Sequence, residues 1–592
     1  MCPRRTANLV IAGAMLLSTW LGALASAASL PPRIIVVGTG LAGLSAALES
    51  AQQGAEVTII DMWSVFGGTS IMSGGKIAIV DTPLQQSKGI ADSPELALSD
   101  FERRSKDFDK KWVDYYARNS RAEIFDWLSE AGVNFRKVVR FGGNSVPRAH
   151  GTGEEGVGLM VPLFQACVKH PRITFVWNTK VTELITEEER VVGARGENIR
   201  LSQTHTFRGG AVILATGGFQ SNLNLIREHW PKSLPVPERI LTGSGANSQG
   251  IGHAMAEALG ADFHRMDYVW NYPYGLPDPR YPGSDRGLLF AHGQSVWVNG
   301  EGNRFVNESG SIEEKMTAIL SQNPTSYWAI FDHRQKERVY VAGSFFAKFP
   351  VVDRLIYGDN TLVKKADSIG ALAEILGIPG ATLEATVENF NAMIERGNDS
   401  AFGRFEEGRK LPQKIKEPPF YAVQLFPLTR KNMGGVQTDH SCRVVDRDGK
   451  IIPGLYAAGE LSGFAAINGT SPLEGTFLGP CVVTGRVAGR TACRESSQRP
   501  SETAKRLEAI KRSSPSKENS KSSCIDCHDL KVLTQLNRPG FTHFEYAHRQ
   551  VLKMNYNCVM CHSNLIPYST TTHHIDWGIL SHSCRICHLP EK

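Results

Sequence analysis

The sequence has few cysteines over most of its length, no block of basic residues, and no apolar run beyond its first 30 residues long enough to cross a membrane. Only five of the 11 cysteines lie before residue 500, which excludes a disulfide scaffold there. The 65 basic and 59 acidic residues leave a net charge of +6, so the charge gives no indication of nucleic-acid binding. With 592 residues, 41% of them hydrophobic, the chain has room for roughly three or four domains and is neither fibrous, disordered nor polytopic.

The N-terminus has the three parts of a secretory signal. Arg4 and Arg5 precede an apolar run from about Leu9, and Ala25-Ser26-Ala27 provides a small-residue cleavage site. We therefore expect residues 1–27 to be removed and the mature protein to be periplasmic and not itself membrane-spanning. An uncleaved anchor is the alternative.

A nucleotide-binding pattern follows directly. The residues predict a buried strand over Ile34–Val37, a helix over Leu41–Gln52 and a second strand over Glu56–Ile60. The connection has the G-x-G-x-x-G spacing, which permits a tight turn and lets backbone approach a pyrophosphate at a helix N-terminus. An acid at the end of the second strand suits an adenosine ribose. The candidate cofactor residues are Gly38, Gly40, Leu41, Ala42, Gly43 and Asp61.

Four later stretches favour FAD as the dinucleotide. Two glycine-rich turns follow the second strand, further strands are predicted over 212–218 and 454–460, and a helix over Thr484–Thr491 is expected to direct its N-terminus at the flavin. Further candidate cofactor residues are Gly67, Gly68, Thr69, Ser73, Gly74, Gly75, Thr216, Gly217, Gly218, Gly459, Glu460 and Gly475.

The phrases GGTSIMSGG, GNRFVNE, NMGGV and IPGLYAAGE together resemble the flavoprotein family of fumarate reductases, succinate dehydrogenases and 3-ketosteroid dehydrogenases, over residues 33 to 494. The resemblance implies an α/β fold in which a Rossmann-like FAD-binding domain is split by an α+β capping domain. Membrane-bound relatives attach FAD to a histidine before the second glycine turn. Residues 69–72 read Thr-Ser-Ile-Met here, so we expect non-covalent FAD.

The C-terminal segment predicts a small haem-packed cytochrome c domain with three covalent c-type haems. Three Cys-x-x-Cys-His motifs provide thioether cysteines and proximal histidines: Cys524, Cys527 and His528; Cys558, Cys561 and His562; Cys584, Cys587 and His588. His548 and His574 each lie ten residues before a motif and are candidate distal ligands; the third is His543, His573 or His582. The tail resembles small multihaem class III cytochromes, and zinc binding is the alternative.

The expected divisions follow from these patterns and from the resemblance. A Ser- and Lys-rich stretch with almost no apolar residues marks a solvated linker before the haem motifs. The divisions are a signal peptide (1–27), the FAD-binding domain (28–234 and 411–494), the capping domain (235–410), the linker (495–522) and the trihaem domain (523–592).

A flavin domain joined to haems resembles the soluble flavocytochrome c fumarate reductases, but three family positions differ. The family places its proton-donating arginine four residues after the glutamate of R-F-V-N-E, and Ile312 stands there. The substrate histidine before M-G-G is absent from residues 428–435, and the second substrate arginine is absent from residues 468–475. These departures predict that fumarate is not the substrate.

Other side chains remain available for catalysis. Tyr272 and Tyr274 lie in an aromatic cluster where the family has a substrate-facing strand, and a tyrosine can donate a proton; packing at a domain interface is the alternative. Arg430 and Lys431 suit a carboxylate clamp, and a solvated basic turn is the alternative. His292 is a weaker candidate proton relay.

The leading hypothesis is a periplasmic FAD-dependent oxidoreductase of CH–CH bonds that reduces an activated C=C bond of a small-molecule substrate. A quinol-linked membrane cytochrome or a periplasmic cytochrome would supply its haems with electrons. The second hypothesis reverses the flow: a dehydrogenase of a saturated or cyclic ketone that donates electrons to the haems. The third is an electron carrier whose flavin only stores charge.

Overall fold

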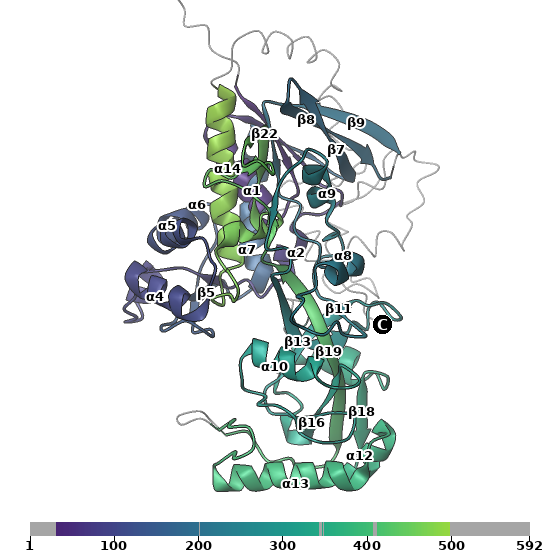
Figure 1. Cartoon of the computed structure of the whole chain (residues 1–592). Helices are drawn as coiled ribbons and strands as arrows, with labels where there is room; N and C mark the ends of the chain where they lie inside the picture. Colours follow the sequence, from purple (N-terminus) through teal and green to yellow (C-terminus); the bar gives the residue numbers. More distant parts are fainter. Residues whose placement is uncertain (1–30, 201, 343–345, 347, 406–410, 498–592) are drawn as a thin grey trace, which may run out of the picture.

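The computed structural model describes residues 31–497 except 201, 343–345, 347 and 406–410. The predicted signal peptide, the haem motifs and all but the first residues of the predicted linker lie outside the described residues. Two lobes are visible in Figure 1: one holds a mostly parallel sheet with α1 and α14, and the other holds a mixed sheet with α12 and α13.

The first lobe is built on a six-stranded sheet of order β21-β22-β10-β1-β2-β6, parallel except for β21. The side chains of β1 alternate between two cores, as a strand requires. Ile34 and Val36 face helices α1, α7 and α14, whereas Ile35 and Val37 face the sheet β7-β8-β9. The bounds are β1 Arg33–Val37, β2 Glu56–Ile60, β6 Ile173–Val176, β10 Ala211–Leu214, β21 Arg443–Val445, β22 Ile451–Ala457, α1 Leu41–Gln52, α7 Glu155–Lys169, α14 Leu478–Ser497, β7 Thr179–Glu187, β8 Arg190–Asn198 and β9 Gln203–Arg208.

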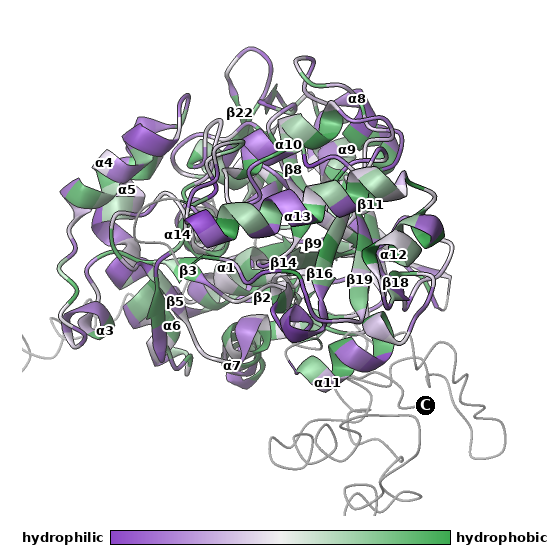
Figure 2. Ribbon diagram, turned by 90° about the horizontal axis from the view of Figure 1, so that it is seen from below, coloured by the Kyte–Doolittle hydropathy of each residue, from purple (hydrophilic) through white to green (hydrophobic). Residues whose placement is uncertain are grey.

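The second lobe is built on an eight-stranded sheet of order β15-β16-β19-β13-β14-β17, with β11 and β18 also paired to β19. The strands β14, β16 and β19 are strongly apolar in Figure 2 and carry much of this lobe's core. The bounds are β11 Leu241–Thr242, β13 Val269–Pro277, β14 Gly287–His292, β15 Val296–Val298, β16 Tyr327–Asp332, β17 Val339–Val341, β18 Val363–Ala366, β19 Phe420–Asn432, α10 Ile312–Leu320, α11 Phe349–Val352, α12 Ile369–Leu376 and α13 Gly380–Arg396.

Shorter elements connect and flank the two lobes. A two-stranded sheet pairs β12 with β20, and a three-stranded sheet has the order β3-β5-β4. Their bounds, and those of the remaining helices, are α2 Gly68–Ile71, β3 Ile77–Ala78, α3 Pro83–Gln86, α4 Pro94–Arg104, α5 Lys110–Ser120, α6 Trp127–Glu130, β4 Lys137–Val139, β5 Ala149–Gly151, α8 Leu223–Glu228, α9 Ile251–Glu257, β12 Phe263–His264 and β20 Gly435–Val436.

The local predictions around the first glycines are confirmed, whereas one helix start is wrong. The predicted helix 41–52 and strand 56–60 are α1 and β2 with identical bounds. The helix expected to start at Thr484 starts at Leu478, and Thr484 lies inside it, where its hydroxyl donates to the Pro480 carbonyl over 2.6 Å. This hydroxyl-to-i−4 bond belongs to a helix interior, so Thr484 places no helix N-terminus at the site.

Strand β19 links the two lobes. It runs from the mixed sheet, where β16 and β13 pair along it, toward the parallel sheet (Figure 1). Its C-terminal residues Thr429–Asn432 pair with Trp270 and its neighbours on β13. The strand therefore delivers Arg430 and Lys431 to the region between the lobes.

Candidate functional site

The first cavity lies at the carboxyl ends of β1, β2 and β10, where open parallel sheets bind ligands. Of the three spaced glycines, two are required by close packing and one faces the cavity. A Cβ on Gly43 would lie 1.9 Å from the carbonyl oxygen of Gly38, and one on Gly38 would lie 2.4 Å from that of Ala215. A Cβ on Gly40 would meet nothing within 4 Å, because Gly40 faces the cavity.

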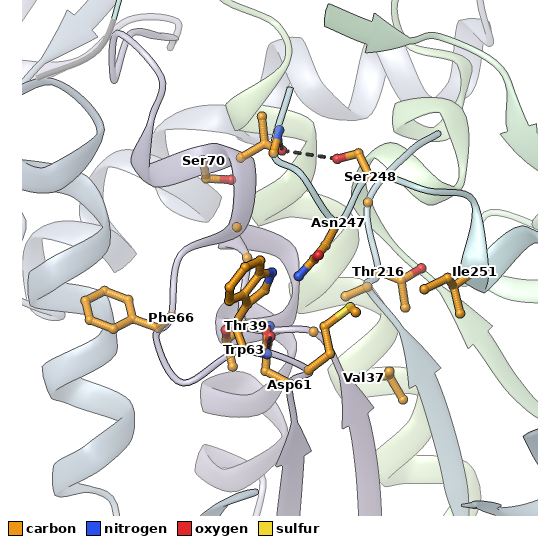
Figure 3. A pocket seen from close by; sticks show the side chains of 18 of the residues that line it. Val37, Thr39, Asp61, Trp63, Phe66, Ser70, Thr216, Asn247, Ser248 and Ile251 are labelled. Atoms are coloured by element: carbon orange, nitrogen blue, oxygen red, sulfur yellow. Dashed lines mark hydrogen bonds between the residues drawn. The ribbon is translucent and has the colours of Figure 1, made fainter. Parts of the chain in front are cut away.

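Asp61 closes β2 and lies in the wall of this cavity (Figure 3). Its carboxylate accepts hydrogen bonds from the Thr39 amide over 2.8 Å, the Thr39 hydroxyl over 2.6 Å and the Trp63 amide over 2.9 Å. Burial raises the pKa of Asp61, and these hydrogen bonds oppose that shift. The bonds fix the acid at the end of the strand, where the sequence places a ribose contact.

Most of the predicted cofactor residues lie in this wall. They are Gly38, Gly40, Leu41, Ala42, Asp61, Gly68, Thr69, Thr216, Gly217 and Glu460. Eight of the predicted FAD residues do not line it. Four of these line the adjoining cavity described below, and the other four permit turns or close packing: Gly43, Gly67, Gly218 and Gly459.

The residues present fit a dinucleotide on two independent observations. Gly40 leaves a cradle beside the N-terminus of α1, where a pyrophosphate binds backbone N–H groups. Within the part of the chain that the structure describes, the side-chain amide nitrogen of Asn247 and the hydroxyl of Thr216 are buried without a hydrogen-bond partner, and both residues line the cavity. Figure 3 shows Asn247 directed into the cavity toward Trp63. Unpaired buried polar atoms of this kind are satisfied by a polar ligand.

Sequence reasoning missed two parts of the wall. The loop Gly245–Ser248 follows β11, and Thr179–Val181 begins β7. Thr69 ties the first of these to α2, because its hydroxyl accepts from the Gly245 amide over 3.1 Å. The signal that was available is the Gly- and Ser-rich run GSGANSQG over residues 243–250. No comparable signal marks Thr179–Val181.

The second cavity adjoins the first and shares Thr69, Ser70, Glu460 and Cys481 with it. All four predicted catalytic side chains meet here, although they come from β13 and β19. The predicted glycine-turn residues Ser73, Gly74, Gly75 and Gly475 line it too. Side chains that sequence reasoning did not select complete the wall: Lys76, Phe141, Leu289, Tyr340, Ala342, Phe464, Phe477 and Leu478. Glu474 also lines this cavity.

Lys431 and Tyr272 form a pair in this second cavity. The ammonium donates to the Tyr272 hydroxyl over 3.0 Å and lies 3.5 Å from the centroid of the Phe477 ring. Burial lowers the pKa of Lys431 to about 7, and Arg430 adds to that shift while Glu474 opposes it. Burial also raises the pKa of Tyr272 well above its usual value. A tyrosine that keeps its proton beside a lysine that titrates near neutrality is suited to acid–base catalysis.

Arg430 contributes a cation whose hydrogen-bonding capacity is only partly used. Its backbone carbonyl accepts from the Ser244 hydroxyl over 2.7 Å, which holds the residue in register. Its Nε is buried without a hydrogen-bond partner among the described residues, and the guanidinium lies 6.0 Å from the Tyr272 ring centroid. The unpaired donor is available to an oxygen of a bound molecule.

Two carboxylates face these cations. The Glu460 carboxylate accepts from the Asn432 amide over 3.0 Å, and burial raises the pKa of Glu460 to about 7. Glu474 accepts from the Trp270 indole nitrogen over 3.3 Å. With Lys76, the cavity wall therefore carries three basic and two acidic groups, which leaves little surplus positive charge.

Ile312 and His292, which the sequence analysis considered, do not line either cavity. Ile312 begins α10 and packs in the apolar cores, where it cannot donate a proton. His292 contacts the Gln335 carbonyl through Nε2 over 2.9 Å and stacks on Phe331, with ring centroids 3.9 Å apart. Because His292 is packed in the second lobe, it carries no proton into this cavity.

The cysteines Cys167, Cys442, Cys481 and Cys493 are free and buried, and Cys481 also lies in the cavity wall. Within residues 31–497, apart from the gaps given above, no group of His, Cys, Asp or Glu side chains is arranged to hold a metal ion. Among the helices described, none has the length and apolar character required to cross a bilayer. The predicted haem cysteines and histidines, from Cys524 to His588, lie outside this part of the chain.

Comparisons with known proteins agree with this geometry. A KsdD-like steroid dehydrogenase of Mycobacterium tuberculosis is 30% identical over 78% of this chain and 95% of its own length. A fumarate reductase (cytochrome) of Shewanella frigidimarina is 31% identical over 80% of this chain and 79% of its own. The solved open conformation of a flavocytochrome c3 fumarate reductase superposes with a TM-score of 0.67 at 29% identity, covering 81% of each chain.

The FAD binding domain family matches residues 33–478, which include both cavities. Its relatives act on carbon–carbon bonds, and the cradle at Gly40 and the unpaired amide of Asn247 fit the cofactor. The chain therefore belongs to the FAD binding domain family and is an FAD-dependent oxidoreductase that acts on CH–CH bonds.

Proposed function

We propose that the protein reduces a carbon–carbon double bond conjugated to a carbonyl or a single carboxylate, and that the reaction takes place in the second cavity. The observation that carries this proposal is the convergence of Arg430, Lys431, Tyr272 and Tyr274 on a cavity that adjoins the dinucleotide cavity. Cations and neutral phenols beside a flavin site provide what such a reduction requires: an anchor for oxygen and a source of a proton.

Bound FAD supplies hydride-transfer chemistry. The chain holds it through the glycine turn at Gly38 and Gly40, the carboxylate of Asp61 and the loop that contains Asn247. Because residues 69–72 contain no histidine, the proposal includes non-covalent FAD.

The chain's own groups then act on the substrate. Arg430 binds the carbonyl or carboxylate oxygen through its unpaired donor and stabilises the charge that builds there. Tyr272 or Tyr274 delivers the proton to the α-carbon. The rings of Phe464 and Phe477 contribute apolar wall that excludes water around the reacting carbons.

The charges of the wall favour a monoanion or a neutral carbonyl over fumarate. A dicarboxylate carries two negative charges, whereas Glu460 and Glu474 already offset most of the positive charge of Arg430, Lys431 and Lys76. A second carboxylate would be desolvated without its own cation, at a cost of several kcal/mol. This agrees with the absence of the family's substrate histidine and second arginine.

The proposal extends to the electron supply. Three Cys-x-x-Cys-His motifs between Cys524 and His588 support three covalent haems that receive electrons from a quinol-linked membrane cytochrome or a periplasmic cytochrome. The N-terminal pattern of residues 1–27 supports export by a cleaved signal. Mass spectrometry of the denatured mature chain is expected to show three haem adducts and no flavin adduct; fewer haems or a bound flavin would contradict this part.

A dehydrogenase that oxidises a saturated or cyclic ketone is the second candidate. The Lys431–Tyr272 pair favours it, because a neutral lysine with a phenol can remove a proton beside a ketone as readily as return it. The KsdD-like relative also supports it.

One experiment separates these functions from simple electron storage. The purified holoprotein is assayed with unsaturated acids and cyclic enones using reduced viologen, and with the saturated counterparts using an oxidised dye. Turnover in the first assay supports the reductase, and turnover in the second alone supports the dehydrogenase. Failure with every compound in both assays would leave only the electron-carrier hypothesis.

A further inference from the structure

Tyr274 has a cationic partner that lies outside the second cavity. Lys315 is on α10, is 5% exposed, and donates from Nζ to the Tyr274 hydroxyl over 2.5 Å. Tyr274 lines the cavity but Lys315 does not, so the lysine contacts the tyrosine from behind the wall. Two lysine–tyrosine pairs, each with one buried member, therefore converge on the same cavity, one through Lys431 and one through Lys315.

Lys315 lies on the same helix as Ile312, the position at which the resemblance places the family's proton-donating arginine. Lys315 lies three residues after Ile312, so the two side chains share a face of α10. The helix is fixed at its start by reciprocal bonds: the Glu314 amide donates to the Ser311 hydroxyl over 3.1 Å, and the Ser311 amide donates to the Glu314 carboxylate over 2.8 Å. A cation held one turn further along α10 is thus positioned on a capped, rigid element.

We propose that Tyr274 and Lys315 form a proton relay into the second cavity, with Tyr274 as the acid that contacts substrate and Lys315 as the positioning residue that resupplies it. This proposal rests on the function proposed above. When a hydride has added to the β-carbon of an unsaturated carbonyl, the α-carbon holds an electron pair. The Tyr274 O–H bond breaks as a C–H bond forms, the phenolate takes a proton from the Lys315 ammonium, and the neutral amine regains a proton from water.

The surroundings of Lys315 suit this exchange. Burial lowers the pKa of Lys315 to about 8, with Arg404 adding to the shift, while Glu308 and the helix neighbours Glu313 and Glu314 oppose it. The ammonium also donates to the Glu308 carbonyl over 3.4 Å and lies 5.9 Å from the Trp297 ring centroid.

The same surroundings keep Tyr274 in its acid form. Burial raises the pKa of Tyr274, and Glu474 adds to that shift. The phenol therefore stays protonated until it transfers its proton to the carbanion. The arrangement differs from the Lys431 pair, because Lys431 lines the cavity itself and is exposed to the substrate.

The test compares the pH dependence of kcat in the holoprotein and in Lys315→Met and Lys315→Arg. In the wild type, kcat for reduction is expected to fall above about pH 8, as Lys315 loses its proton. In Lys315→Met the plateau drops at least tenfold with KM unchanged and the fall disappears. In Lys315→Arg the fall moves to higher pH by more than one unit. Lys365→Met, which removes an exposed lysine from β18, is the matched control.

Two results would overturn the relay and leave Lys315 as a packing residue. One is a wild-type kcat that does not fall above about pH 8. The other is a kcat of Lys315→Met that still falls there, whatever its plateau value. A second readout needs no turnover. In protein carrying ¹³C-labelled lysine, the Cε resonance that disappears in Lys315→Arg is expected to titrate near pH 8; titration near the ordinary lysine value would also overturn the relay.

Failure of the proposed function is recognised separately. If the wild type neither reduces nor oxidises any compound of the panel, the function fails whatever the titration shows. If the wild type turns over and neither Lys315 variant alters the pH profile, the relay alone fails.

Discussion

The two cavities are built from different materials, although they share part of one wall. About half of the residues that line the first cavity come from one stretch of the chain, 37–72, in which glycines let main chain approach a ligand. The second cavity takes its four candidate catalytic side chains from β13 and β19, which are far apart in the sequence, and further lining residues from stretches such as 69–76 and 474–481. The comparison indicates that the glycine turn of the first cavity is encoded locally, whereas the candidate catalytic side chains of the second are brought together by the pairing of β13 with β19.

The largest effect is expected from a substitution in the glycine turn of the first cavity. In Gly43→Val, the new side chain would meet the Gly38 carbonyl, since even a Cβ would lie 1.9 Å from it. We expect a loss of more than about 4 kcal/mol of folding stability and no bound flavin. Gly40→Ala is the matched control, since its Cβ meets nothing within 4 Å. It is expected to fold within about 1 kcal/mol of the wild type but to retain less FAD.

Thermal unfolding and flavin absorbance after desalting measure these two effects. Equal stability of Gly43→Val and Gly40→Ala would show that the glycine spacing does not set the packing of α1 on β1. Full flavin retention in Gly40→Ala would show that Gly40 does not face the cofactor.

This contrast also explains what could be predicted from the sequence. The strand–turn–helix–strand pattern from Ile34 to Asp61 is local, so its elements appear with almost the predicted bounds. The loop Gly245–Ser248 and the strand start Thr179–Val181 reach the same cavity only through tertiary contacts, and their sequences carry weak or no signals.

The second cavity shows more clearly which residues cannot be predicted from the sequence. Tyr272, Tyr274, Arg430 and Lys431 were selected by resemblance, and the structure brings them together. Lys315 could not be selected, because nothing in the sequence distinguishes a buried helix lysine from an exposed one. Thr484 illustrates the opposite error: a small-residue run predicts a helix start, but apolar packing of the preceding turn extends α14 back to Leu478.

A substitution in the second cavity alone should affect catalysis and leave the cofactor site intact. In Arg430→Ala, kcat/KM is expected to fall by about 2–4 kcal/mol of transition-state stabilisation, because the charge that builds on the substrate oxygen loses its donor. Flavin content should stay normal, as measured by absorbance. Unchanged activity in the double variant Arg430→Ala/Lys431→Ala would show that the basic pair is only a solvated turn.

The tyrosine hydroxyls should separate binding from proton transfer. Tyr272→Phe keeps the ring that packs beside Lys431 but removes the hydroxyl that accepts its hydrogen bond. We expect kcat to fall with little change in KM, because the hydrogen bond that positions Lys431 is lost. Tyr274→Phe should show the larger fall in kcat, about a hundredfold, since Tyr274 is the acid of the proposed relay and a general acid acts mainly in the transition state. A rise in KM at constant kcat would instead assign these hydroxyls to substrate binding.

The charge of Lys431 in the second cavity can be tested through the pH dependence of folding stability. Its folded-state pKa of about 7 lies below the ordinary lysine value of 10.5, so between these pH values the unfolded chain binds more protons than the folded one. Its contribution to stability therefore rises with pH across that window and is least favourable below pH 7. Lys431→Met should stabilise the protein by about 1–3 kcal/mol at pH 6 and by less at pH 9.

Calorimetry of the flavin-domain transition in the full-length protein measures this difference. Lys365→Met, at an exposed position, is the control and should show no such pH dependence. If the stabilisation of Lys431→Met did not change with pH, folding would not lower the pKa of Lys431.

The smallest effect is expected where the sequence departs most visibly from the family. In Ile312→Arg, the family's proton-donating residue is restored, but position 312 packs in apolar cores and lines neither cavity. The substrate histidine and second arginine of the family remain absent, and Glu474 stays in the cavity wall, so a second carboxylate still lacks a cation. We expect no oxidation of reduced viologen by fumarate in this variant, with flavin content confirming that it folds. Fumarate turnover in Ile312→Arg would show that one arginine decides the substrate, and that the charge balance of the second cavity does not.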